Sequence, residues 1–130
     1  MELDHVGVVV RDLAAAKRFA SETLGLELER EGPQPALGVT TAFFRAGDAL
    51  IEFIQPDDPD RAPGGQARID HVALRVDDLG ESQRRLAADG AAFDQDEPLR
   101  LGANDNLFSK AETTAGVRLQ LMRAAEPPPD

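Results

Sequence analysis

Two histidines stand at matching places in a repeated stretch, and their side chains are suited to binding a metal ion or moving a proton. Residues 4–13 read DHVGVVVRDL, and residues 70–79, 66 positions later, read DHVALRVDDL. His5 and His71 are second in the two copies, and the chain has no other histidine. Imidazole nitrogens bind transition metals and exchange protons near neutral pH. The repeat therefore predicts two related modules, each contributing one histidine.

Each copy of the repeat is typical of a strand that leads into a helix. Side chains alternate along a strand, so Val6, Val8 and Val10 share one face and His5 points to the other. Gly7 and Ala73, two residues after the histidines, are small and leave room in front of them. Each run ends in Asp-Leu, a pattern that indicates a strand stopping at a helix N-cap.

After this strand and helix, each half of the sequence predicts three more strands. In the first half we expect a helix over 13–24, a strand over 26–29, a loop over 31–38, and a hairpin of strands 39–45 and 49–55. In the second half we expect a helix over 80–88, strands over 92–94, 106–110 and 117–123, and a loop over 96–105. The predicted fold is thus α+β, with two tandem βαβββ modules over about 1–56 and 68–123, a linker over 57–67 and a disordered tail over 124–130.

Composition limits the classes of protein to which the chain can belong. With 130 residues, 42% of them hydrophobic, it can form one compact domain with a real core. It has no cysteine and a net charge of −10, so we expect no disulfides, no thiolate ligands and no nucleic-acid partner. We see no apolar run of about 18 residues and no signal-peptide pattern. We therefore expect a cytoplasmic protein with no membrane partner.

Four motifs together resemble a known family over essentially the whole chain, from His5 to Met122. They are the two histidine stretches, the segment Ile51-Glu52-Phe53 before Pro56, and Val117-Arg118-Leu119-Gln120-Leu121 after Gly116. The pattern resembles the vicinal oxygen chelate superfamily of glyoxalases, bleomycin-resistance proteins and extradiol dioxygenases. The sequences of these motifs are most similar to those of methylmalonyl-CoA epimerases and bacterial glyoxalase I. This resemblance implies that the curved mixed sheets of the two modules form a cup that holds a divalent metal.

The resemblance implies one metal ligand from the first strand and one from the last strand of each module. The repeat agrees with this, because Glu52 and Gln120 are 68 positions apart and become equivalent when the modules are superposed. The metal ligands would then be His5, Glu52, His71 and Gln120, a nitrogen and oxygen set that suits Mn²⁺, Fe²⁺, Co²⁺, Ni²⁺ or Zn²⁺. Two alternatives stay open: the histidines are hydrogen-bonded pocket residues, or Gln120 binds only a metal water.

The resemblance implies a metal-dependent isomerase, epimerase or lyase that acts on a small oxygenated or acyl-thioester substrate through a metal-stabilised enolate. The family's last-strand ligand is usually a glutamate that doubles as a base, whereas this chain has Gln120. A second epimerase glutamate aligns with Ala36 or Leu37. Glu52 is therefore the candidate catalytic base. The alternatives are an iron-dependent oxygenase of the same fold and a non-catalytic ligand-binding or resistance protein.

Three arginines are candidates for binding an anionic substrate. Arg75 shares a strand face with His71, Arg118 shares one with Gln120, and Arg100 lies in the predicted loop. A guanidinium group can pair with a carboxylate or phosphate at the mouth of a cup. Because relatives commonly pair, we also expect a homodimer.

Overall fold

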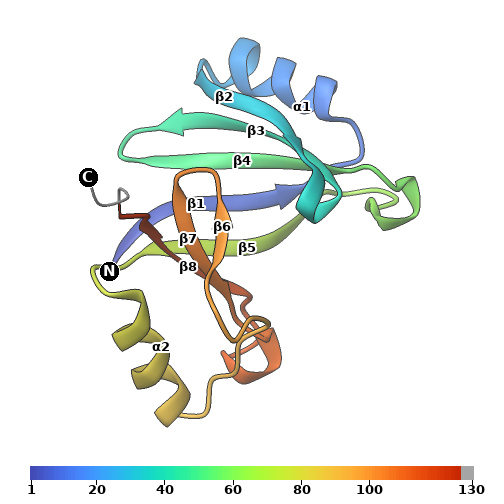
Figure 1. The fold of residues 1–130 in the computed structure, drawn as a ribbon. Coiled ribbons are helices and arrows are strands. Elements are labelled where there is room, and N and C mark those ends of the chain that lie inside the picture. Colours follow the sequence, from blue (N-terminus) through green and yellow to red (C-terminus); the bar gives the residue numbers. More distant parts are fainter. Residues whose placement is uncertain (127–130) are drawn as a thin grey trace. The chain divides into compact units, whose positions relative to one another are not determined.

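The structure is a computed structural model that describes residues 1–126, and its helices and strands follow the same order twice (Figure 1). The first set is β1 (Glu2–Val9), α1 (Leu13–Arg18) with a π-helical turn (Phe19–Thr23), β2 (Glu27–Gln34), a 3₁₀ turn (Pro35–Leu37), β3 (Val39–Ala46) and β4 (Ala49–Pro56). The second set is β5 (Arg68–Arg75), α2 (Leu79–Ala88), β6 (Leu99–Leu101), β7 (Asn104–Phe108), a 3₁₀ turn (Ala111–Thr113) and β8 (Leu119–Ala124). The predicted α+β class and the βαβββ order of each half are confirmed.

The chain divides into two compact units, which we describe separately. The N-terminal unit is Asp4–Asp70, and the C-terminal unit is the chain from His71 onward together with Met1–Leu3. A 3₁₀ turn (Pro59–Arg61) lies between β4 and β5. Within the described residues, no helix has the length and apolar character needed to cross a membrane.

In the N-terminal unit the strands are ordered β2-β3-β4-β1, with β1 parallel to β4 and the other pairs antiparallel. Helix α1 lies against one face of these strands (Figure 1). Val8 and Val10 of the repeat pack there with Leu13 of α1 and with Phe44 and Phe53 of the central strands. The predicted alternation is therefore correct, because Val8 and Val10 face the helix and His5 faces the other side.

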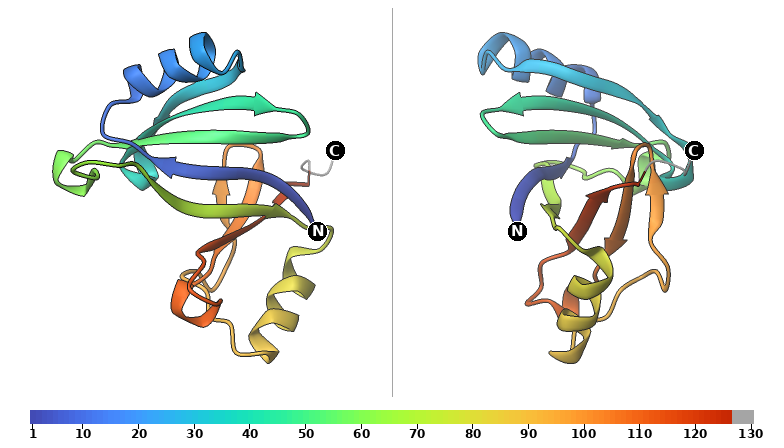
Figure 2. Two further views of the ribbon diagram at one scale, coloured as in Figure 1. Left: turned by 180° about the vertical axis from the view of Figure 1, so that it is seen from behind. Right: turned by 60° about the vertical axis from the view of Figure 1, so that its left-hand side comes forward.

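The C-terminal unit repeats this arrangement with strand order β5-β8-β7-β6 and with β5 parallel to β8. Helix α2 runs beside β8 (Figure 2). Its first residue, Leu79, packs with Val76, Leu107 and Leu121 in a buried apolar cluster. His71 and Gln120 are on the strand face away from this cluster, since their chain neighbours Val72 and Leu121 have the opposite orientation.

Each helix begins at the leucine of an Asp-Leu pair, at Leu13 as predicted and at Leu79, one residue before the predicted start, because the aspartate caps it. Asp12 Oδ1 accepts a hydrogen bond from the backbone N–H of Ala15 at 3.0 Å, and Asp78 Oδ1 accepts one from Glu81 at 2.9 Å. Each cap satisfies a backbone N–H group that has no partner within the helix. The two Asp-Leu pairs of the repeat therefore set the start of the two helices.

The predicted loop over 31–38 is wrong for its first half, because β2 continues to Gln34. Pro33 pairs with Thr40 in this strand, and the ladder includes a bulge between Leu28 and Arg30. Strand β2 is at the edge of its sheet. Since an edge strand has one side without a partner strand, it tolerates a residue that lacks a backbone N–H.

The predicted strand over 92–94 is reduced to a single bridge between Phe93 and Ser109. Strand β6 forms instead inside the predicted loop, where Leu99 pairs with Asn106 and Leu101 with Asn104. The turn between β6 and β7 includes Gly102 at φ 59°, a left-handed conformation that glycine adopts without strain. Phe93 packs on the apolar cluster beside α2, so burial holds this segment without a full ladder.

The predicted tail over 124–130 begins too early. Ala124 is the last residue of β8, and the backbone N–H of Ala125 donates to Ala103 O at 2.8 Å. The rest of that prediction, from residue 127, lies outside the described residues.

The cap of α2 is open to a direct test. Replacing Asp78 with Ala removes the acceptor for the Glu81 N–H, and we expect the free energy of unfolding to fall by about 1 kcal/mol. Urea denaturation followed by circular dichroism measures this change. Asp78→Asn is the matched control, since it retains a side-chain oxygen at the cap. Equal stability of Asp78→Ala and the unmodified protein would contradict the assignment.

Candidate metal centre

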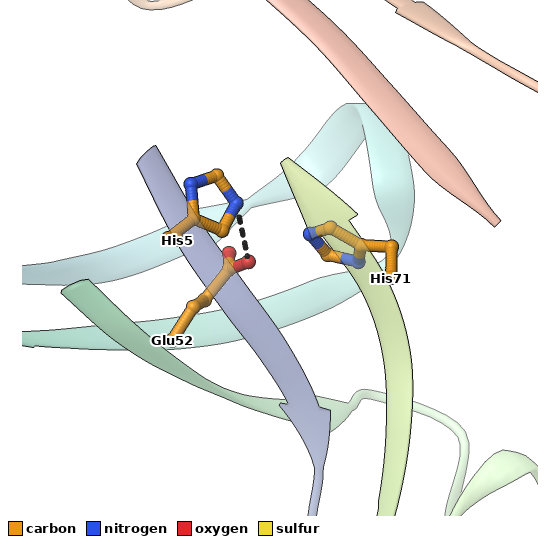
Figure 3. A group of neighbouring side chains, drawn as sticks. All are labelled: His5, Glu52 and His71. Atoms are coloured by element: carbon orange, nitrogen blue, oxygen red, sulfur yellow. Dashed lines mark ion pairs between the residues drawn. The ribbon is translucent and has the colours of Figure 1, made fainter. Parts of the chain in front are cut away.

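In the N-terminal unit, parallel pairing of β1 and β4 places His5 and Glu52 together. Gly7, two residues after His5, is the register partner of Glu52. Because residues two apart on a strand share a face, both side chains lie on the face away from α1. His5 Nε2 is 3.3 Å from Glu52 Oε1, and both residues are buried (Figure 3).

Asp4 holds the other nitrogen of the His5 ring, a contact that we did not predict. Its Oδ2 lies 2.7 Å from His5 Nδ1. A carboxylate at this distance accepts a hydrogen bond from Nδ1–H, so in the neutral ring Nε2 is the unprotonated nitrogen. Metal-ligating histidines commonly have such a carboxylate behind them. The signal was in the sequence, since an aspartate precedes the histidine in both copies of the repeat.

The resulting geometry suits a cation between His5 and Glu52. With Nδ1 protonated, the Nε2 lone pair and a carboxylate oxygen face each other at 3.3 Å. Two acceptors this close in a buried place repel each other unless a positive charge is bound, either a proton on the ring or a metal ion. The donor set thus fits a divalent ion.

In the C-terminal unit, His71 and Gln120 occupy the equivalent positions. Ala73, two residues after His71, is the register partner of Gln120. Both polar side chains are buried on the face away from α2. The equivalence of Glu52 and Gln120 that the repeat suggests is therefore present in the strand register. Figure 3 also labels His71. The role of these residues as metal ligands stays a prediction.

In each unit, a phenylalanine on the next strand lies beside the last-strand residue of the candidate site. Phe43 is the register partner of Glu52, and Phe108 is that of Gln120. The His5 and Phe43 rings meet edge to face with centroids 5.3 Å apart, and His71 meets Phe108 in the same way at 6.1 Å. Such contacts restrict the imidazole orientation before any ligand binds.

An arginine also stacks on each of these phenylalanine rings. The guanidinium carbon of Arg118 is 4.5 Å from the Phe108 centroid, and its Nη2 is 3.6 Å from Asp94 Oδ2. Arg30, which we did not single out from the sequence, lies 4.0 Å over Phe43. Arg118 therefore stands near His71 within its unit, as expected for a residue that shares a face with Gln120.

The other two predicted arginines have different surroundings. Arg75 is half-buried on the His71 side of β5. Arg100 is exposed and pairs with Asp105 at 2.7 Å. Asp105 shares a face with Leu107, which packs against α2, so Arg100 lies on the side opposite Gln120. Substrate binding by these arginines stays a prediction.

Comparison with known proteins identifies the family. The family model of the Glyoxalase/Bleomycin resistance protein/Dioxygenase superfamily matches residues 4–109. Mitochondrial methylmalonyl-CoA epimerase of Bos taurus is 28% identical, with 94% of this chain and 74% of that protein covered. Ethylmalonyl-CoA/methylmalonyl-CoA epimerase of Cereibacter sphaeroides is 32% identical over 97 residues, covering 68% of this chain and 71% of that protein.

A solved structure agrees with the sequence comparisons. Methylmalonyl-CoA epimerase from Mycobacterium tuberculosis superposes with a TM-score of 0.84 at 27% identity, with 96% of this chain and 89% of that chain covered. The fold and the repeat agree with the family match. The chain belongs to the Glyoxalase/Bleomycin resistance protein/Dioxygenase superfamily.

Proposed function

We propose that this protein is a metal-dependent enzyme of the epimerase type that removes the α-proton of an acyl-coenzyme A thioester. The observation that best supports the proposal is the buried pair of His5 and Glu52, whose Nε2 and Oε1 atoms are 3.3 Å apart, since an imidazole nitrogen and a carboxylate oxygen are common ligands of divalent metals. The substrate class is supported by relatives named as acyl-CoA epimerases, one of which aligns with 94% of the chain.

The proposed metal ligands are the four residues that the repeat selects: His5, Glu52, His71 and Gln120. Two imidazoles, one carboxylate and one amide oxygen suit Mn²⁺, Fe²⁺, Co²⁺, Ni²⁺ or Zn²⁺. When bound, such an ion would act as a Lewis acid toward the thioester carbonyl of the substrate.

Glu52 is the base in this proposal, because it is the one carboxylate of the four proposed ligands. Gln120 is neutral and cannot accept the α-proton. The positions that align with the second epimerase glutamate, Ala36 and Leu37, lie in an exposed 3₁₀ turn. Epimerisation needs removal of the proton from one face and its return to the other. With one base, exchange of the α-proton is expected to be faster than epimerisation.

The metal proposal predicts that both histidines are needed for binding. His5→Ala and His71→Ala should each abolish tight binding of Mn²⁺ or Co²⁺ to the metal-depleted protein, measured by isothermal titration calorimetry. Asp4→Asn should weaken binding by about 10–100-fold, because it removes the carboxylate behind His5. Arg100→Ala, on the opposite face, is the control and should bind normally. Full metal occupancy in either histidine variant would overturn the site.

The assignment of the base predicts the behaviour of a single substitution. In deuterated water, the metal-loaded protein should exchange the α-proton of methylmalonyl-CoA, and Glu52→Gln should slow this exchange by about 10²–10⁴-fold. Mass spectrometry of the recovered thioester measures the exchange, with metal occupancy checked in each sample. Glu29→Gln, an exposed control, should have no effect. Undiminished exchange by metal-loaded Glu52→Gln would rule Glu52 out, and oxygen consumption without exchange would point to an oxygenase.

We also propose that the protein is a homodimer. The apolar side chains of Leu3 and Ile69, two residues before the histidines, are 46% and 68% exposed, and a dimer interface would cover them if it includes these strands. Light scattering should give twice the chain mass of 14.0 kDa. A mass of one chain at every concentration would contradict this proposal.

A further inference from the structure

We propose that Asn106 makes position 120 specific for a neutral amide and directs the carbonyl oxygen of Gln120 toward the face that presents His71. Asn106 is a positioning residue in this proposal, since it acts through Gln120. Only the ligand role of that oxygen rests on the proposed function. The orientation itself is a property of the metal-free C-terminal unit.

The hydrogen bonds of Asn106 fix which way its own amide points. Its Nδ2 donates to Leu99 O at 3.2 Å and to Asn104 O at 3.1 Å, and the residue is 1% exposed. A reversed amide would place Oδ1 against two carbonyl oxygens and leave both without a donor. Since a buried polar group without a partner is costly, the observed orientation is the stable one.

This orientation in turn decides what residue 120 can be. With Nδ2 occupied, Asn106 presents Oδ1 to Gln120 and accepts a hydrogen bond from Gln120 Nε2 at 2.7 Å. The amide of Gln120 therefore turns its carbonyl oxygen away from Asn106. An ionised glutamate has only acceptors, so at this position it would set one oxygen against another in a buried place. Glutamine fits where glutamate does not.

The N-terminal unit provides an internal comparison. Phe43 and Phe108 are the partners of Glu52 and Gln120, and two residues before them lie Thr41 and Asn106. Thr41 is therefore the counterpart of Asn106, and it is 3% exposed. A hydroxyl group can donate to a carboxylate, whereas Oδ1 of Asn106 can only accept. Each unit thus has, at this place, a residue compatible with its own last-strand side chain.

The first test observes the amide groups directly. In ¹⁵N NMR spectra of the metal-free protein, the Gln120 side-chain N–H₂ signals should be shifted from random-coil values, and one proton should exchange slowly with water. Asn106→Ala, which removes the acceptor, should abolish that protection. Thr41→Val, at the equivalent place in the other unit, should leave the Gln120 signals unchanged. An unprotected Gln120 amide in the unmodified protein would overturn the proposal.

The second test gives the C-terminal unit the residue types of the N-terminal unit, by combining Gln120→Glu with Asn106→Thr. Gln120→Glu should lower the melting temperature of the metal-free protein by about 5–10 °C, because it removes a buried hydrogen bond and creates an oxygen–oxygen contact. In the Asn106→Thr background the same change should cost less than half as much, since threonine can donate. Comparing the two costs cancels the effect of Asn106→Thr alone.

The outcomes separate this proposal from the proposed function. Equal costs of Gln120→Glu in both backgrounds, or no cost in either, would overturn the role of Asn106 and leave metal binding and proton exchange to be judged by their own assays. If Gln120→Glu does not fold, the NMR test still decides, because it uses the unmodified protein and Asn106→Ala.

Discussion

Parallel pairing between the first and last strands of each unit determines where every polar group of the candidate site lies. It makes Gly7 the partner of Glu52 and Ala73 the partner of Gln120. A shift of one residue in either ladder would turn these side chains to the helix face. The shift is opposed by the valines and leucines between them, which pack on α1 or α2. The core thus holds the site in register.

The sequence was informative where periodicity and capping act locally. The alternation after each histidine, the two capping aspartates and the hairpin of β3 and β4 were all predicted, because neighbouring residues determine them. The missed features depend on distant contacts. Pro33 is tolerated in β2 only because that strand is at an edge, and β6 forms because β7 is available beside it. The prolines and glycines of the sequence do not by themselves show that a strand lies at a sheet edge or that a neighbouring strand is available for pairing.

The candidate site also combines residues that the sequence pattern identified with residues that only the folded structure brings together. His5, His71, Glu52 and Gln120 were selected from the repeat, whose spacing is visible in one dimension. Asp4 and Asn106 were missed as functional residues, since their importance comes from bonds to His5 and Gln120. Two amides 14 positions apart have no pattern that distinguishes them from surface residues. Only the antiparallel pairing of β7 and β8 brings the two amides within hydrogen-bond distance.

The bond between Asn106 and Gln120 also bears on how such a site could diverge. Glutamine and glutamate codons differ at one base, so the exchange of an amide for a base at position 120 is a short mutational step. The buried partner makes that step unfavourable unless residue 106 changes first or at the same time. A library that randomises position 120 alone would therefore miss variants that one randomising both positions would recover.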